Sequence, residues 1–196
     1  MRTAFGKIKT RLAAGVGSTV AVGAAAVYSV FGAGPPPPVA QYGAGSAIEA
    51  GRWRVTPQRA WVSHKRVYGV PIKPGQQALV LEADLSNRTR TSTGSYSDLL
   101  RLQPVPGAKP EDPVVAQVRD PQIAPLLHPG MPERVVYVWM MPGSATPPAS
   151  LSVDVVAETY KPVDNLFGTP GWFNPAVIGR VTLPLGQPPA GAEQAS

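Results

Sequence analysis

The 196-residue chain contains no cysteine, and this absence removes several kinds of site at once. Without a thiol there is no disulfide bond, thiolate metal ligand, cysteine nucleophile or lipid-modified cysteine anchor. Histidine is scarce as well, with only His64 and His128. Neither stands in a motif for zinc, serine-hydrolase or calcium-binding chemistry. We therefore expect no catalytic residue, no metal ion and no cofactor, and we do not expect an enzyme.

Charge is also sparse. Charged residues make up 15% of the chain, whereas proline (24) and glycine (20) are unusually frequent, which excludes a helical bundle. Of the net charge of +6, four positive charges come from residues 2–11, and the remaining residues carry 14 basic against 12 acidic side chains. A nucleic-acid-binding protein concentrates its basic residues on the folded domain. We therefore expect no nucleic-acid partner.

Residues 12–33 form an uncharged, apolar stretch of 22 residues. As a helix it would be long enough to cross a hydrocarbon core of about 30 Å. The basic residues lie before it, and the next charge after it is Glu49. Because basic flanks stay in the cytoplasm, we predict a single-pass protein of the cell membrane, with residues 1–11 as a cytoplasmic basic tail and the C-terminal part extracytoplasmic.

The same stretch has a second interpretation as a secretion signal. Residues 24–26 are three alanines and could form a cleavage site after a shorter apolar segment. Apolar residues then resume with Val27, Tyr28, Val30 and Phe31, which cleavage would leave exposed. This favours an uncleaved transmembrane anchor, with a released domain as the alternative.

Two further features surround the span. Small residues at every fourth position, including Ala13, Gly17, Ala21 and Ala25, would form a helix face suited to contact with another helix in the membrane. Since 14 of the 22 positions are Ala, Gly, Ser or Thr, composition alone can also produce such a stripe. Residues 34–45 are rich in proline and glycine and predict a linker that begins as a stiff polyproline rod.

From Trp53 onward the pattern is typical of strands. Apolar and polar residues alternate in ALVLEADLSN (78–87) and SLSVDVVAE (150–158), and RVVYVWMM (134–141) is apolar on both faces. Further strands are predicted at 51–56, 99–105, 114–119 and 177–185, and one helical turn at 119–127. Gly/Pro turns and the absence of a long helical period predict an all-β fold, an antiparallel immunoglobulin-like β-sandwich over residues 46–186, with a disordered tail at 187–196.

Two segments support a family resemblance. LEADLSNRTRTSTG (81–94) is a strand ending in Asn before a Thr/Ser-rich loop, and LHPGMPERVVYVWMMP (127–142) is a Pro-Gly turn before an aromatic strand. Together they resemble the bacterial extracellular telokin-like domains, immunoglobulin-like modules of largely unknown function on lipoproteins and single-span membrane proteins. The chain lacks the lipid-anchor cysteine, so the resemblance implies anchoring by the span. Asn87-Arg88-Thr89 also matches a glycosylation sequence, although an Asn at a strand end more often bonds its own turn.

Two segments are candidate contact surfaces. In GWFNP (171–175), Trp172 and Phe173 would either form a binding surface or plug one end of the sandwich. In the segment 61–75, Trp61, Lys65 and Arg66 could contact an anionic envelope polymer or lipid head groups, or could belong to a lysine-protected strand edge. We expect a non-enzymatic, membrane-anchored binding or accessory module with a membrane or envelope protein as partner. The alternative is a secreted domain, released by signal-peptide cleavage, that binds a cell-wall polymer or another ligand.

Overall fold

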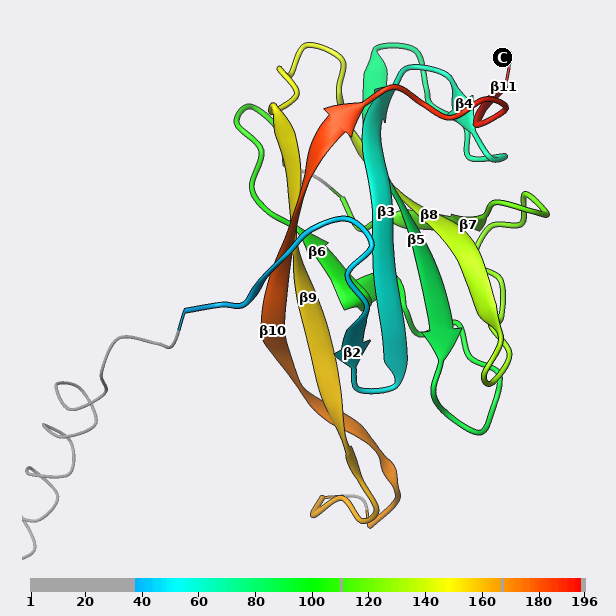
Figure 1. The fold of residues 1–196 in the computed structure, drawn as a ribbon, viewed down its shortest axis with the longest axis vertical. Helices are drawn as coiled ribbons and strands as arrows, with labels where there is room; N and C mark the ends of the chain where they lie inside the picture. The colour runs from blue at the N-terminus through cyan, green and yellow to red at the C-terminus, as the bar shows by residue number, and fades with distance from the viewer. Residues whose placement is uncertain (1–37, 110, 167, 195–196) are drawn as a thin grey trace, which may run out of the picture. The chain divides into compact units, whose positions relative to one another are not determined.

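The computed structural model describes residues 38–194 except 110 and 167 (Figure 1). The predicted basic tail, the transmembrane helix with Ala13, Gly17, Ala21 and Ala25, and most of the linker lie outside these residues. From Val39 the described chain forms one compact unit. Within residues 38–194, the structure has no helix with the length and apolar character needed to cross a membrane.

Every strand predicted from the sequence is present. These strands are β3 (Trp53–Ser63), β5 (Gln76–Asn87), β6 (Leu100–Leu102), β7 (Val114–Gln117), β8 (Pro132–Pro142), β9 (Ser150–Lys161) and β10 (Gly171–Gly186). Four short strands were not predicted: β1 (Gln41–Tyr42), β2 (Ile48–Ala50), β4 (Arg66–Val67) and β11 (Glu193–Gln194). The predicted helical turn at 119–127 is wrong, because this segment forms isolated β-bridges with other parts of the same chain instead. A 3₁₀ turn, η1, occurs at Ser97–Leu99.

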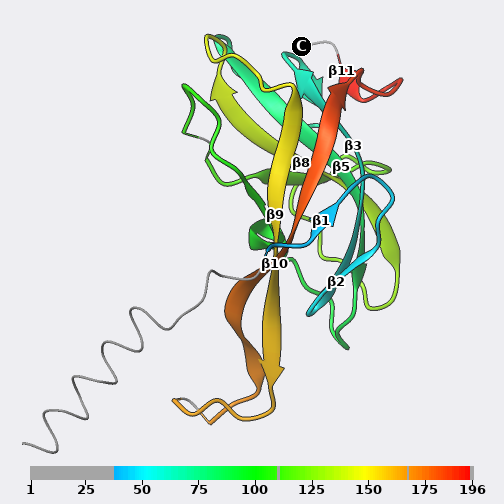
Figure 2. The same cartoon turned by 60° about the vertical axis from the view of Figure 1, so that its left-hand side comes forward.

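The strands form two facing layers, so the all-β sandwich is confirmed (Figures 1 and 2). One layer contains β6, β9, β10 and β1, and the other contains β2, β3, β5, β8 and β7. Strand β10 joins them: it pairs antiparallel with β9 over most of its length, and then its last residues, Leu185 and Gly186, pair parallel with β3. Most pairings are antiparallel, but β10 is parallel to both β1 and β3.

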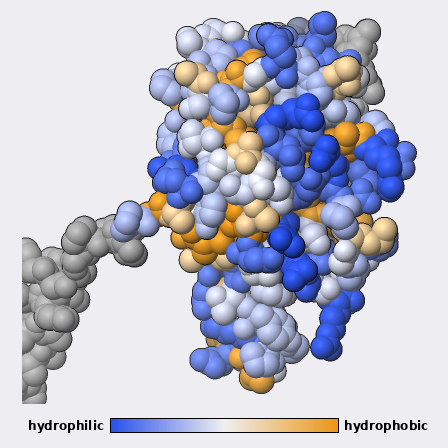
Figure 3. Space-filling model, viewed as in Figure 1, coloured by the Kyte–Doolittle hydropathy of each residue, from blue (hydrophilic) through white to orange (hydrophobic). Residues whose placement is uncertain are grey.

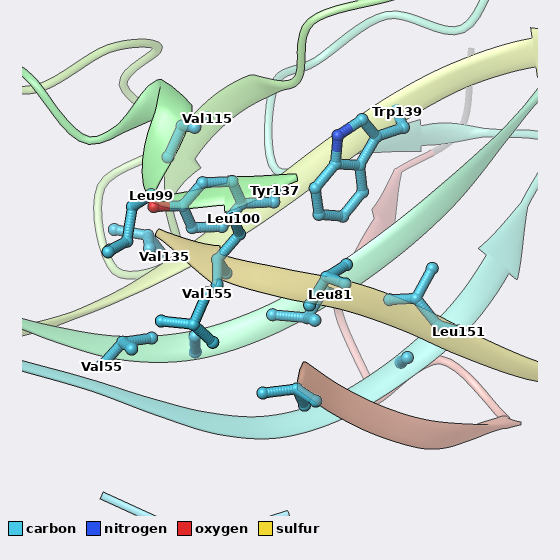
Figure 4. Packing of buried hydrophobic residues seen from close by; sticks show 14 of the residues in the cluster. Val55, Leu81, Leu99, Leu100, Val115, Val135, Tyr137, Trp139, Leu151 and Val155 are labelled. Atoms are coloured by element: carbon cyan, nitrogen blue, oxygen red, sulfur yellow. The ribbon is translucent and has the colours of Figure 1, made fainter. Parts of the chain in front are cut away.

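Alternate residues of the strands fill the space between the layers. Leu81 of β5, Trp139 of β8 and Leu151 of β9 turn into the same space in Figure 4 and belong to one buried cluster. Two tyrosines in this cluster hydrogen-bond to backbone carbonyls: the Tyr137 hydroxyl donates to Tyr96 O at 2.9 Å, and the Tyr96 hydroxyl donates to Pro125 O at 2.6 Å. Burial raises the pKa of Tyr96 to about 12, because the charged phenolate would lose its hydration.

The second layer also buries apolar residues on its outer face. Trp61, Val80 and Val136 belong to this second cluster, which is covered by the segment 64–75 and by the C-terminal residues. Ala192 has no exposed surface, and its carbonyl accepts a hydrogen bond from the Tyr68 N–H at 3.2 Å. The predicted disordered tail is therefore wrong for residues 187–194, because an apolar outer face has to be covered and the tail, through β11 paired with β4, helps to cover it.

The domain also begins earlier than predicted. Residues of the expected linker add β1 to the free edge of β10, where the Arg180 N–H donates to Ala40 O at 2.7 Å. The Gly45 N–H donates to Pro57 O at 2.7 Å. An exposed strand edge carries unpaired backbone groups, and the segment from Val39 satisfies some of them.

Candidate functional site

Strands β9 and β10 continue beyond the sandwich as a two-stranded ribbon, which we call the arm (residues 158–178; Figures 1 and 2). Its ladder pairs Trp172 with Tyr160 and Phe173 with Thr159. A bulge follows, at which Asn174 has a φ of 55°. The sequence predicted a loop at 171–175, whereas these residues begin a strand, because the end of β9 supplies the backbone partners.

The arm carries most of the exposed apolar side chains. Of the nine large hydrophobic residues that are exposed in the described part of the chain, five lie on it. Tyr160, Val163 and Leu166 lie on its outer part, and Val177 and Ile178 lie at its base, where Val177 pairs with Val156 of the sandwich. Leu166, in the loop at the tip, is 80% exposed. Figure 3 shows hydrophobic residues at this tip. Water-exposed apolar groups gathered on a projection are typical of a contact surface.

Trp172 and Phe173 lie on opposite faces of the arm and are half-buried. The Trp172 ring lies 5.4 Å from the Tyr160 ring and 5.6 Å from the Arg52 guanidinium, measured between centres. The Phe173 ring lies 5.6 Å from Lys161 Nζ. Neither ring belongs to a buried core cluster, so the interpretation that they plug the sandwich is wrong. Their role in partner binding remains a prediction.

A pocket of about 270 Å³, which we call the arm-base pocket, lies where the arm leaves the sandwich. The β2–β3 turn, the η1–β6 segment and β9 contribute its walls. Its polar lining consists of two arginines, two acids and two serines: Arg52, Arg101, Asp98, Glu158, Ser95 and Ser97. Trp53, Leu99 and Val156 form an apolar floor. The Trp53 Nε1–H donates to Ser95 O at 2.9 Å and so fixes one wall to the core.

One side of the pocket is held by an ion pair. The Arg52 guanidinium contacts the Glu158 carboxylate, and the same guanidinium lies over the Trp172 ring. This close approach depends on Gly51, which has a φ of +67° and lies so near β9 that a Cβ would overlap the carbonyl oxygen of Glu158. The Arg52 Nε is buried and has no hydrogen-bond partner in the part of the chain that the structure describes.

The other side of the pocket offers charged groups that are free. Asp98 and Arg101 are exposed and form no ion pair or side-chain hydrogen bond with any described residue. Both also line an adjoining hollow of about 170 Å³. Their positions are nevertheless defined, because their neighbours Leu99 and Leu100 are buried in the core.

A larger hollow of about 390 Å³ lies on the outer face of the second layer, but its charges are already paired. Arg54 and Arg88 both contact Glu49, at 3.4 and 3.7 Å, and Asp84 accepts two hydrogen bonds from Arg134. The arm-base pocket is therefore the better candidate for a ligand, since its free charges need not leave a protein partner first.

The structure separates the other predicted contact residues from the arm. Trp61 has no exposed surface, so it cannot form part of a binding surface in this fold; the outer apolar cluster and its covering segments enclose it. Lys65 and Arg66 are exposed, and Lys65 Nζ lies 4.0 Å from the Glu193 carboxylate. They lie beside β11, at the opposite end of the sandwich from the arm (Figures 1 and 2).

Two remaining motifs have local roles. Asn87 is fully buried, donates to Thr91 O and Leu127 O, and accepts from the Thr89 N–H, which confirms its predicted turn-closing role. His128 Nδ1 lies 2.8 Å from Ser92 Oγ, but no carboxylate in the described ranges hydrogen-bonds to its other ring nitrogen. Within residues 38–109, 111–166 and 168–194, no three or more His, Cys, Asp or Glu side chains gather in a group that could hold a metal ion.

Comparison with known proteins gives little beyond the fold. No protein-family model matches the chain, and no curated protein matches it. Among solved structures, the chain is similar to an uncharacterized β-sandwich protein from Clostridium difficile, solved at 1.90 Å resolution. The two are 13% identical with a TM-score of 0.49, and the alignment covers 78% of this chain and 98% of the other. The sandwich fold of this protein is shown by its own two layers of strands.

Proposed function

We propose that the protein is a non-enzymatic binding or accessory module, held at the outer face of the cell membrane by residues 12–33. In this proposal the tip of the arm contacts a membrane or envelope protein, so that the chain serves as a subunit of a larger complex. The sandwich would be an immunoglobulin-like domain of the telokin-like type. The observation that supports the proposal is the concentration of exposed apolar side chains on the arm.

The tip has the chemistry of a protein contact. Val163 and Leu166 are exposed, and full burial of such a side chain contributes about 1.5–3 kcal/mol. Residues 162–170 carry one acid and no lysine or arginine. Surfaces that bind anionic membranes are rich in basic residues, so this tip favours a protein over a lipid surface. Confinement by the anchor would raise the local concentration of the domain for a partner in the same membrane.

Site-specific photo-crosslinking in intact cells tests the contact. A photoreactive residue at Leu166 is expected to give a defined adduct, which Val163→Ser should weaken. The matched control is the same photoreactive residue at Lys73, in the loop between β4 and β5 outside the arm. No adduct at Leu166, or the same adducts from both positions, would contradict the proposal.

The secreted alternative has its own support and its own test. The arm-base pocket offers unpaired polar groups to a ligand, which suits a domain that binds a wall polymer. Cell fractionation with N-terminal sequencing separates the two locations. Recovery of a mature protein that begins near Val27 from the medium would refute the anchor and favour the alternative.

A further inference from the structure

We propose that the arm-base pocket binds an uncharged oligosaccharide. In this site Asp98, Arg101 and the pocket serines hydrogen-bond to the hydroxyl groups of one sugar ring, and the chain continues over Tyr160 and Trp172. The inference requires that the protein is a binding module, but it does not depend on the contact made by the tip of the arm.

The charge balance of the pocket selects against charged ligands. Arg52 and Arg101 oppose Asp98 and Glu158, so the four charged groups sum to zero. A polyanion would meet two carboxylates, and a polycation would meet two guanidinium groups. A polyhydroxylated neutral ligand needs donors and acceptors together. Guanidinium groups only donate, carboxylates only accept, and serine hydroxyls do either.

The unpaired side chains of the pocket can bind a ligand in place of water. Asp98 and Arg101 have no protein partner within the described residues, so binding breaks no existing ion pair. The buried Leu99 and Leu100 hold both groups in place, which limits the side-chain and loop ordering that binding requires. Ser95 and Ser97 are exposed beside them and line the same pocket.

An aromatic surface continues from the pocket along the arm. Glu158 and Tyr160 are alternate residues of β9 and therefore point to the same face. Trp172 lies directly opposite Tyr160, and Arg52 links the pair to the pocket by lying over the Trp172 ring. Tyr160 is 52% exposed. A sugar ring has a face of C–H groups and an edge of hydroxyls, which matches an aromatic surface beside hydrogen-bonding groups.

The volume of the pocket agrees with this arrangement. About 270 Å³ lies just below the range of about 300–1,000 Å³ for small-molecule sites, so the pocket would hold one terminal sugar unit. The remaining units would lie on the open aromatic surface. This predicts that tetrasaccharides bind more tightly than the corresponding monosaccharides.

Isothermal titration of the full-length protein in detergent micelles tests the site. The probes are cellotetraose, maltotetraose and fully N-acetylated chitotetraose, with dextran sulfate as a polyanion. At least one neutral tetrasaccharide is expected to bind, and Asp98→Ala and Arg101→Ala should each weaken its binding about tenfold or more. Tyr160→Ala should weaken it as well. The matched controls Asp120→Ala and Arg90→Ala, exposed residues that do not line the pocket, should leave it unchanged.

Any of three results would overturn the inference. No neutral tetrasaccharide binds, or neither Asp98→Ala nor Arg101→Ala weakens tetrasaccharide binding, or dextran sulfate binds and the neutral tetrasaccharides do not. Misfolding is not expected to obscure the test, because both residues are exposed and unpaired within the described chain, and each variant should keep the melting temperature of the parent. Leu166→Ser should leave the sugar titration intact while it removes the tip contact. Failure of one proposal is therefore distinguishable from failure of the other.

Discussion

Replacement of Trp61 by alanine tests whether the outer face of the second layer is a true core. The sequence allowed this residue to be a surface contact, and an exposed contact residue can be truncated with a stability change of about 0.5 kcal/mol or less. In the structure the side chain has no exposed surface and packs with Val80, Val136 and Ala192. The two interpretations therefore predict stability losses that differ severalfold.

The expected loss can be worked from burial. A tryptophan side chain buries about 200 Å² of mostly apolar surface, which at about 25 cal/mol per Å² contributes about 5 kcal/mol. The Trp61 Nε1–H is buried without a hydrogen-bond partner in the described structure, and its removal would recover about 1–3 kcal/mol. Trp61→Ala should therefore lower the free energy of unfolding by about 3 kcal/mol, near the low end for such truncations. Trp61→Phe removes the unpaired N–H and keeps most of the packing, so it should stay within about 1 kcal/mol of the parent.

Urea unfolding of residues 38–196, whose described part forms a compact unit, measures these changes. In thermal unfolding, Trp61→Ala should lower the melting temperature by roughly 6–12 °C. Trp172→Ala is the matched control, since Trp172 is half-buried outside both cores and should cost about 1 kcal/mol or less. If Trp61→Ala cost no more than the control, the outer cluster would not stabilise the domain and Trp61 would return as a candidate contact residue.

Two further predictions concern Gly51 and Tyr96. Gly51→Ala should destabilise the domain by about 2–4 kcal/mol, because at this positive φ a Cβ would overlap the Glu158 carbonyl oxygen. The control Gly45→Ala, at a φ of +75° in open space, should cost about 1 kcal/mol. Equal stability losses in urea unfolding would argue against the close packing of the β2–β3 turn on β9. The pKa of Tyr96 is raised to about 12 in the folded state and lies near 10 in the unfolded state, so the folded state favours the neutral phenol. This stabilisation is fully present below about pH 10 and falls by about 1.4 kcal/mol per pH unit between about pH 10 and 12. Tyr96→Phe should make the fall in unfolding free energy over that range shallower by this amount. The remaining slope would come from Tyr137 and Tyr68, whose pKa values burial also raises. An unchanged slope would contradict the assignment.

The positions of the main strands followed from local pattern. Residues 78–87 and 150–158 alternate apolar and polar side chains, and the structure places β5 and β9 there. The doubly apolar run at 134–141 became β8, which is buried on both faces in its central part. Such patterns are readable because side chains in a strand alternate between its two faces at every residue.

Segments without a periodic pattern were harder to predict. The tail at 187–194 and the linker at 39–45 look disordered because they contain many small, polar or proline residues. In the structure they are ordered by partners far away in sequence: β4 for the tail and β10 for the linker. The burial of Trp61 was not predicted for the same reason. The segments that cover this side chain are not revealed by any local sequence pattern.

The arm-base pocket could not have been found from the sequence. Arg52, Asp98 and Glu158 are widely separated along the chain, and nothing in their local sequence distinguishes them from solvated surface charges. The lining comes from three short segments, near residues 50–53, 95–101 and 156–158, that are far apart in sequence, with Pro175 beside them. The arm was not predicted, because GWFNP (171–175) has the composition of a loop.

The sequence by itself determined the all-β class, the order of the principal strands and the absence of thiol chemistry, because these depend on composition and on periodicity within a few residues. The tertiary structure alone decided that the outer face of the second layer is a core, that β9 and β10 project as an arm, and that four charges meet at its base. The physical reason is that burial and charge pairing are properties of contacts between distant residues, and each such contact forms only when the whole chain has folded.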